Sequence, residues 1–336
     1  MRNWIHSKVA PEDIVIGSKV RLARNFDGEL FTDKMKTEDA IENVEKVYSI
    51  LSKQNEAFKL FKLWDLDYNL SKAYMEKHLI SGDLLKRKDR GAFVINEDET
   101  ISIMINEEDH LRIQCITDGF NLKEAYNEAN KIDDLIEQEV DYAFHEDYGY
   151  LTSSPTNVGT GLRASVMIHL PALTMSEEIP SILKGLNQVG MTISGVYKEG
   201  SKVYGNIYEV SNSISLGVNE EEIISNLEGV VLNIISEEKK FREILLTKYN
   251  DEIEDKIFRS YGILKSAKLI DSREMLQILS DLRIGVELSL IDIHKETLNR
   301  LLIETKDSLL QLNSEKNLTI KDKRIERANL VKKILK

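Results

Sequence analysis

The chain has 336 residues, of which 42% are hydrophobic and 30% charged, and its formal net charge is -12. This composition is typical of a folded globular protein of about two domains, and the acidic balance argues against nucleic-acid binding, which requires a cationic surface. The apolar runs are too short to cross a bilayer, the first residues lack the apolar stretch of a secretory leader, and the single cysteine, Cys115, excludes an internal disulfide. We therefore expect a cytoplasmic protein with neither a membrane nor a nucleic acid as partner.

The first half of the chain mixes helical and strand-like patterns. Apolar side chains recur at helical spacing over residues 38–54, and Asn121 stands where it would cap a second amphipathic helix. Residues 92–95 and 100–105 are apolar runs separated by a polar turn, which predicts a β-hairpin, and the alternation over residues 111–115 predicts a further strand. A sheet flanked by helices is the expected result.

The second half changes from mixed structure to helices alone. Strands are predicted at residues 165–170, 191–196 and 203–210, with a helix capped by Ser176 between the first two and a long helix capped by Asn219 after the third. From about residue 247 the strand pattern ends, and four helices are predicted at residues 250–264, 272–285, 291–312 and 320–335. The linkers Asp271-Ser272 and Asn313-Ser314 are short, which favours antiparallel packing.

Three polar clusters interrupt or adjoin the predicted strands. In the first, residues 17–24, three cations fall within six residues. Strand alternation places Lys19 and Arg21 on the same side of the chain, where they could hold phosphate oxygens. A solvated basic strand edge is the alternative.

The second cluster, residues 106–112, directly follows a predicted strand and holds three adjacent acids. Mutual repulsion favours an exposed turn, whereas a carboxylate pair could bind a cationic substrate and remove its proton. His110 has no second histidine or cysteine at metal-ligand spacing, so we expect a structural role for it.

The third cluster, residues 149–163, is rich in glycine and hydroxyl side chains, so its backbone could approach a ligand closely. No Gly-Lys-Ser/Thr sequence follows, and the cluster therefore does not match the Walker phosphate-binding loop. A structural turn is the alternative.

In this order the clusters resemble the signatures of the phosphagen kinases, the ATP:guanidino phosphotransferases. Residues 106–112 resemble their acidic signature and residues 154–167 their second signature. The Ala-Ser-Val-Met ending, followed by His169-Leu170-Pro171, is most similar to the McsB branch, the protein-arginine kinases. Shorter matching segments lie at residues 76–81, 205–208 and 211–212. The resemblance is continuous over about residues 13–245 and looser beyond them.

The resemblance implies an α+β fold in two domains. Residues 1–246 would form a phosphagen-kinase-like catalytic domain, with a largely antiparallel sheet flanked by helices and a mainly helical part over residues 1–85. Residues 247–336 would form an all-α C-terminal domain. The implied activity is transfer of the ATP γ-phosphate to arginine side chains of proteins, in bacterial stress response and protein quality control. ATP and Mg²⁺ are the implied cofactors, with the ion held largely by phosphates and water and no metal ligands from the protein.

Transfer to arginine requires a base, because a guanidinium with a pKa of about 12.5–13.8 is a poor nucleophile while protonated. The resemblance assigns this role to Glu108, with Glu107 in support, and places Ser154 at the family's reactive cysteine position. It also implies a set of ATP-binding positions: Ser18, Lys19, Val20, Arg21, His78, Arg112, Arg163, Ala164, Ser165, Val166, Met167, Ser194, Gly195, Val196, Tyr197, Lys198 and Glu199.

Three positions depart from the family pattern. The family has arginine where Lys19 stands, and lysine lacks the bidentate fork. Ser154 cannot supply the thiolate of a cysteine. Arginine is expected at Ser194, where Lys198 could partly replace the charge. Two hypotheses therefore stand: an active protein-arginine kinase, or a weakened or silent kinase homologue that acts as an adaptor or binding module.

A third hypothesis, a kinase of free arginine or another small guanidine, is disfavoured. Small-metabolite relatives resemble one another in a sizeable helical domain before the first basic motif, whereas here 16 residues precede Gly17. The acceptor site is then expected to be open enough for an arginine on a protein surface.

The tail at residues 321–336 carries seven lysines and arginines against two acids, a net charge of +5. A solvated helix face explains this, and an anion site is the alternative. Residues 323–328 resemble the Arg-Asp-x-x-Arg-Ala motif with which McsB relatives read phosphoarginine. They keep Arg327 but have Arg324 in place of the acid, so we expect weak phosphoarginine regulation. The resemblance also implies an McsA-like activator, a CtsR-like repressor, Clp protease machinery and a homodimer.

Overall fold

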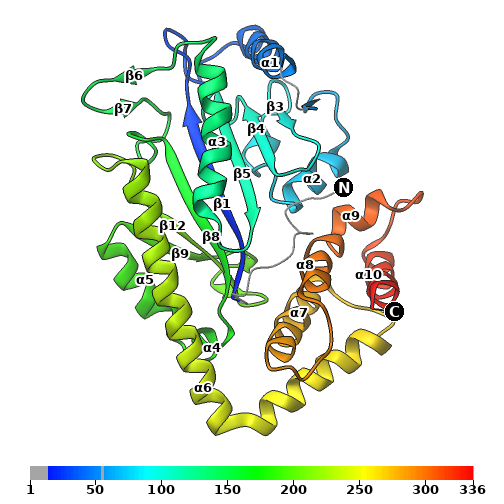
Figure 1. Cartoon of the computed structure of the whole chain (residues 1–336). Helices are drawn as coiled ribbons and strands as arrows, with labels where there is room; N and C mark the ends of the chain where they lie inside the picture. Colours follow the sequence, from blue (N-terminus) through cyan, green and yellow to red (C-terminus); the bar gives the residue numbers. More distant parts are fainter. Residues whose placement is uncertain (1–13, 54–56, 336) are drawn as a thin grey trace.

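A computed structural model describes residues 14–53 and 57–335, and the expectations for residues 1–13 lie outside them. One eight-stranded sheet, with order β2-β3-β4-β5-β1-β8-β12-β9, runs through the molecule (Figure 1). Its strands are β1 Val15–Arg24, β2 Lys59–Lys62, β3 Ala92–Ile95, β4 Ile101–Ile105, β5 Leu111–Asp118, β8 Leu162–His169, β9 Met191–Gly195 and β12 Ile207–Asn212. Neighbouring strands pair antiparallel. The predicted α+β class and antiparallel sheet are confirmed.

One face of the sheet is closed by helices. They are α1 (Thr37–Ser52), α3 (Leu122–Glu137), α5 (Ile179–Gln188) and the first half of α6 (Glu220–Ser266). Figure 1 shows α3 and α6 running across this face. Alternate side chains of the central strands, such as Val20, Leu22 and Ala164, are buried against them. A ligand that contacts the sheet must therefore use the opposite face.

The opposite face is apolar only toward its ends. There Phe93, Met104 and Ile207 pack with residues from α2 (Tyr68–Glu76), the 3-10 turn η1 (Leu84–Lys86) and the C-terminal helices. Between these apolar ends the central strands carry polar side chains. Two short hairpins, β6 (Phe144–His145) with β7 (Gly149–Tyr150) and β10 (Lys198–Glu199) with β11 (Lys202–Val203), lie outside the large sheet.

Helix α6 connects the sheet to the C-terminal helices. Asn219 caps it as predicted, because its side chain accepts from the Glu222 N–H while the Glu222 carboxylate accepts from the Asn219 N–H. The backbone leaves helical geometry at Tyr249, and beyond this kink α6 turns beneath the sheet (Figure 1). It leads to α7 (Ser272–Glu287), α8 (Lys295–Glu304), α9 (Asp307–Leu312) and α10 (Ile320–Ile334). The predicted domain boundary at 246–247 falls inside α6, just before the kink at Tyr249, and stays a prediction.

Two predicted helices differ from those observed. The helix expected to begin at Ser176 begins at Ile179 instead, as α5, and Ser176 ends a separate short helix that precedes it, α4 (Pro171–Met175). Glu177 turns the chain with a φ of 58°, and Pro180 fits only the first turn of the next helix. The helix expected over residues 291–312 is α8 and α9, because Lys306 between them has extended backbone geometry.

The strand predicted over residues 203–210 is divided as well. β11 ends at Val203, and β12 begins only at Ile207. Gly205 and Asn206 stand between them with φ of 73° and 52°. This left-handed geometry is incompatible with a continuous strand.

Candidate active site

Four cations gather on the polar face of the sheet. Arg21 of β1 stands opposite Arg163 of β8, and Lys19 stands opposite Ser165. Arg112 lies on β5, the neighbour of β1 on its other side. The predicted sidedness of Lys19 and Arg21 is confirmed. Burial, followed by the charge of Arg112, lowers the pKa of Arg21 to about 10, so these like charges are unfavourable until an anion neutralises them.

A carboxylate on β12 faces the same cations and was missed by sequence reasoning. Glu209 Oε1 lies 2.5 Å from Lys19 Nζ and accepts a hydrogen bond of 3.0 Å from Ser165 Oγ. Burial would raise the pKa of Glu209, but Lys19 and Arg21 outweigh it and the net shift is downward. The register places Glu209 directly opposite Ser194 of β9. This side of the face therefore lacks an arginine at Ser194 and has a carboxylate paired with Lys19.

His78 lines a small cavity whose other walls include Lys19 and Met167. Its backbone is in the left-handed region, with a φ of 64°, and Gln114 Nε2 donates to its carbonyl at 2.9 Å. The ring Nε2 lies 3.2 Å from the Tyr197 hydroxyl. Burial and then the charge of Lys19 lower the pKa of His78 to about 3. The ring is therefore neutral and suited to hydrogen bonding with an uncharged part of a ligand.

The acidic cluster forms a tight turn between β4 and β5. Asn106 has a φ of 59°, its N–H donates to the His110 carbonyl at 2.9 Å, and its side chain donates to the Ala40 carbonyl at 2.7 Å. The alternative of a solvent-exposed turn is wrong for two of the three acids, because Glu107 and Asp109 are each 1% exposed. Hydrogen bonds from distant segments compensate their burial.

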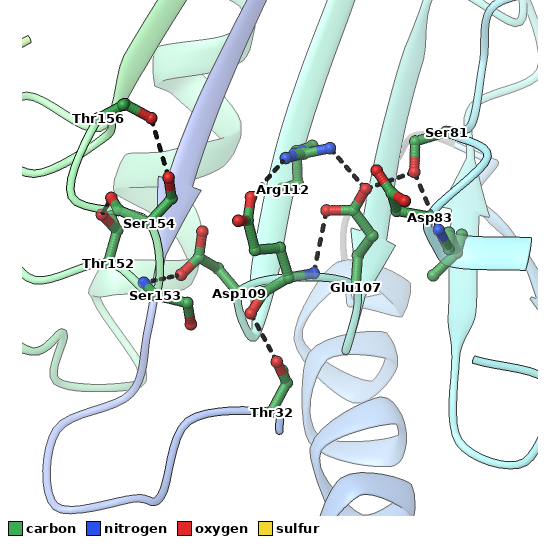
Figure 2. A network of polar contacts seen from close by, with 12 residues as sticks. Thr32, Ser81, Asp83, Glu107, Asp109, Arg112, Thr152, Ser153, Ser154 and Thr156 are labelled. Carbon is green, nitrogen blue, oxygen red and sulfur yellow. Dashed lines mark hydrogen bonds and ion pairs between the residues drawn. The ribbon is translucent and has the colours of Figure 1, made fainter. Parts of the chain in front are cut away.

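Glu107 is held by three donors. Its carboxylate accepts from the Ser81 hydroxyl, from Arg112 Nη1 at 2.6 Å and from the Glu108 N–H at 3.0 Å. Figure 2 shows Ser81 and Arg112 converging on it from either side. A carboxylate engaged in this way holds the Ser81 and Arg112 side chains and the Glu108 backbone in place.

Glu108 is more open. Its side chain is 44% exposed, and its Oε2 lies 3.4 Å from Arg112 Nη2. The Glu108 carbonyl accepts from the Thr32 hydroxyl at 2.5 Å, which anchors the backbone rather than the carboxylate. Burial and then the negative charge of Asp109 raise the pKa of Glu108, opposed by Arg112. A carboxylate with a raised pKa, partly open to solvent, is suited to general-base work.

Asp109 hydrogen-bonds to the third polar cluster and to the residue that directly follows the first. Its Oδ1 accepts from Asn25 Nδ2 at 2.7 Å and from the Ser153 N–H at 2.6 Å, and Asn25 also donates to the Leu151 carbonyl at 3.0 Å. Asp109 Oδ2 is buried without a partner among the described residues. Sequence reasoning missed Asn25 although it directly follows the basic strand, because its partners are far away in the chain.

Ser154 lies in the loop that reaches the acidic turn. Figure 2 shows this loop beside Asp109. Ser154 Oγ is 2.9 Å from Thr156 Oγ1, and the Ser154 carbonyl accepts from the Thr152 hydroxyl at 2.8 Å. Ser154 thus stands near the carboxylates as a neutral hydroxyl with a neutral partner.

Several expected ATP-binding side chains do not face the site. Val20, Ala164 and Val166 are completely buried in the core on the opposite face of the sheet. Ser18 is buried too, where its hydroxyl donates to the Gly119 carbonyl at 2.8 Å and accepts from the Asn121 N–H at 3.0 Å. These four residues shape the strands that carry the cations.

The loop after β9 is only partly directed at the site. Lys198 and Glu199 are exposed, and Glu199 pairs with Arg273 at 2.8 Å. Gly195 packs so closely that an added Cβ would lie 2.3 Å from Val203. Val196 is half-buried in the second core. Tyr197 is the member of this loop that contacts His78.

No metal centre forms from the protein alone. Over residues 14–53 and 57–335, no three His, Cys, Asp or Glu side chains are arranged to hold an ion. His110 is structural, as expected: its Nδ1 accepts from the Phe26 N–H at 2.9 Å, and its Nε2 therefore donates to the Leu30 carbonyl at 2.9 Å. The cation cluster fits a polyphosphate, which would bring Mg²⁺ with it.

Arg327 is buried rather than presented to solvent. Its guanidinium donates to the Thr305 carbonyl at 2.8 Å and the Ile270 carbonyl at 2.9 Å, and it pairs with Asp307. Each of its three nitrogens is engaged by one of these contacts, and the side chain is 1% exposed. Phosphoarginine binding at this residue would require rearrangement and stays a prediction.

Comparison with known proteins gives the same picture over the whole chain. The model of the ATP:guanido phosphotransferase C-terminal catalytic domain matches residues 39–241, and that of the protein-arginine kinase McsB C-terminal domain matches residues 250–336. A protein-arginine kinase of Clostridium botulinum is 52% identical over 100% of this chain and 99% of its own length. One of Clostridium tetani is 50% identical over the same shares.

Solved structures show the same fold. A lombricine kinase superposes with a TM-score of 0.61 at 22% identity over 72% of each chain. A duplicated taurocyamine kinase of Schistosoma mansoni superposes with a TM-score of 0.60 at 21% identity, over 82% of this chain and 42% of its own. Within the described residues, no helix has the length and apolar character to cross a membrane. The chain therefore belongs to the ATP:guanido phosphotransferase family, in its protein-arginine kinase branch.

Proposed function

We propose that this chain transfers the γ-phosphate of ATP to arginine side chains displayed on proteins. The observation that carries the proposal is the position of Arg112. Its guanidinium pairs with both Glu107 and Glu108 while its strand adjoins the one that carries Arg21. Carboxylates for a cationic acceptor and cations for an anionic donor therefore lie side by side.

On the acceptor side, Glu108 orients the arginine guanidinium and takes its proton as nitrogen attacks phosphorus. Its raised pKa makes it a stronger base than an ordinary glutamate. Glu107 holds Arg112 and the Glu108 backbone in place. The neutral Ser154 hydroxyl can contact the acceptor but contributes no charge.

On the nucleotide side, Arg21, Arg112 and Arg163 hold the phosphate chain, and His78 contacts the nucleotide as a neutral ring. Phosphoryl transfer depends mainly on positioning and charge stabilisation, which these residues provide. Mg²⁺, when bound, would neutralise part of the phosphate charge, and its ligands would come from phosphates and water rather than from protein side chains.

A second function, an adaptor with weak or no kinase activity, is favoured by the nucleotide side. Lys19 pairs with Glu209 there, and Ser194 supplies no cation. In that case the chain would bind arginine-bearing proteins without modifying them.

We further propose partners on the grounds of family membership. They are an McsA-like activator, a CtsR-like repressor and Clp protease machinery, with a homodimer as the working assembly. Support comes from relatives of full-length similarity named protein-arginine kinases. A cytoplasmic location stays a prediction from composition.

The test of the first proposal is direct. The chain is incubated with Mg-ATP and an arginine-rich protein, and acid-labile phosphoarginine is sought by mass spectrometry, with free arginine as a parallel acceptor. Phosphoarginine on the protein supports the kinase. Nucleotide binding without any phosphoarginine would favour the adaptor, and phosphorylation of free arginine alone would indicate a small-guanidine kinase.

A further inference from the structure

A lysine from the C-terminal helices reaches the nucleotide side of the sheet. Lys306 stands between α8 and α9, is 9% exposed, and places its Nζ 3.5 Å from the centroid of the Tyr197 ring. The Tyr197 hydroxyl lies 3.2 Å from His78 Nε2. One aromatic side chain therefore connects this lysine to the histidine that lines the cavity.

A second contact fixes the same two segments. The Ser308 N–H donates to Glu76 Oε2 at 3.0 Å, and Glu76 ends α2 two residues before His78. The backbone at His78 is left-handed, with a φ of 64°, a geometry that persists only where surrounding contacts determine it. The turn between α8 and α9 therefore contacts both the backbone approach to His78 and, through Tyr197, its ring.

The lysine itself is held on both sides. Arg327 donates to the carbonyl of Thr305 and pairs with Asp307, the residues that flank Lys306. The backbone on either side of Lys306 is therefore anchored, and its side chain is buried against the Tyr197 ring. Contact between a cation and an aromatic face is strengthened where both groups are removed from water.

The chemistry of this contact bears on the proton of His78. Burial lowers the pKa of Lys306 to about 7, opposed by the charge of Glu76, so the side chain is predominantly a cation below neutral pH. In that form it withdraws electron density from the Tyr197 ring and makes the hydroxyl a better hydrogen-bond donor. When that hydroxyl donates to Nε2 of the neutral imidazole, the ring proton resides on Nδ1. The tautomer and orientation of His78 are then set before the nucleotide arrives.

We propose that Lys306 is a positioning residue for nucleotide binding, which acts through the Tyr197 hydroxyl on the ring of His78. The proposal rests on the proposed function, in which His78 contacts the nucleotide. Lys306 itself does not touch the reacting atoms, so its removal should affect nucleotide affinity rather than the chemical step.

The test measures Mg-ADP binding by calorimetry and the KM for ATP by steady-state kinetics, in the full chain. Lys306→Met and Tyr197→Phe should each weaken Mg-ADP binding and raise the ATP KM by about three- to tenfold, with kcat and the KM for the protein acceptor changed less than about twofold. Lys306→Arg should restore binding. Lys265→Met is the matched control, because Lys265 Nζ lies 4.0 Å from the Tyr261 ring in α6, and it should match wild type.

The double variant decides whether Lys306 acts through Tyr197. Lys306→Met combined with Tyr197→Phe should bind Mg-ADP no more weakly than Tyr197→Phe alone. The proposal would be overturned if the losses of Mg-ADP affinity in the two single variants multiplied in the double variant, or if Lys306→Met bound Mg-ADP like wild type. It would also be overturned if the loss of affinity accompanied a lowered melting temperature and Lys306→Arg did not restore it.

Binding is measured without phosphate transfer, so the result holds whether or not phosphoarginine forms. A wild-type chain that binds no Mg-ADP would overturn both this proposal and the kinase. If wild type binds Mg-ADP but the Lys306 variants do not show the expected loss, only this proposal is overturned, and the proposed kinase activity is unaffected.

Discussion

The acidic turn and the nucleotide side share one face of the sheet but are held in different ways. In the turn, Asp109 accepts hydrogen bonds from Asn25 and from the Ser153 backbone, so two segments that are distant in sequence fix one carboxylate. On the nucleotide side, charge is set by single side chains, as in the pair between Lys19 and Glu209. The catalytic carboxylates therefore depend on a network, whereas phosphate binding can be altered one residue at a time.

The largest effect is expected at the proposed base. Glu108→Gln keeps size and hydrogen-bonding capacity but cannot accept the proton, so kcat for arginine phosphorylation should fall by about 10²–10⁴-fold. Affinity for Mg-ADP, measured by calorimetry, should stay close to wild type. Wild-type-like turnover in this variant would remove Glu108 from the mechanism.

The network around Asp109 should show the next largest effect. Asp109→Ala leaves one N–H of the Asn25 amide and the Ser153 N–H without their acceptor, and such buried donors cost about 1–3 kcal/mol each. Chemical denaturation should show a lower free energy of unfolding, and displacement of Glu108 should reduce turnover by about 10²-fold. Asp134→Ala is the control, since its contact with Asn130 is exposed and should be worth under about 0.5 kcal/mol. Equal effects of the two variants would contradict the network.

The pH dependence of transfer sharpens the account of the turn. Glu108 must be deprotonated to act, and burial and Asp109 raise its pKa, so kcat/KM should fall about tenfold per pH unit below that raised value. The acid limb should therefore lie above the ordinary glutamate pKa of about 4.3. Asp109→Asn removes the neighbouring charge and should move the limb to lower pH. If the acid limb of the pH profile does not move in Asp109→Asn, the charge of Asp109 does not raise the pKa of Glu108.

On the nucleotide side, Glu209 should determine whether an arginine introduced at Ser194 can contact the phosphates. Ser194→Arg places a guanidinium opposite Glu209 and should pair with it, so the single variant should gain only a few-fold in kcat/KM. Combined with Glu209→Gln, the arginine can reach the phosphates, and a charged hydrogen bond of about 1.5–3 kcal/mol corresponds to roughly ten- to a hundredfold. If Ser194→Arg raised kcat/KM equally with and without Glu209→Gln, pairing of the new arginine with Glu209 would be excluded.

The smallest effect is expected for Lys19→Arg. A cation is already present at this position, so only the fork geometry changes, and Glu209 would pair with either side chain. Steady-state kinetics should show a change in kcat/KM of less than about threefold. A gain as large as that of the combined Ser194 and Glu209 variant would mean that charge geometry at β1, rather than at β9, limits transfer.

Local patterns predicted part of this site, and distant contacts account for the rest. Alternation alone placed Lys19 and Arg21 on one side of a strand, and the cap of α6 at Asn219 could be recognised from adjacent residues. Burial of Asp109 could not, because its donors are 84 and 44 residues away in sequence. Likewise, the break at Lys306 depends on Arg327, which contacts the Thr305 carbonyl from another helix.

The most direct test of the central claim is a single-turnover comparison of wild type with Glu108→Gln. Excess enzyme is mixed with γ-labelled Mg-ATP and an arginine-rich protein, and label on arginine is followed with time. We expect wild type to form phosphoarginine, and Glu108→Gln to bind nucleotide equally well but transfer phosphate at least about 10²-fold more slowly. Wild type that binds nucleotide but never labels arginine, or equal rates in both proteins, would contradict the central claim.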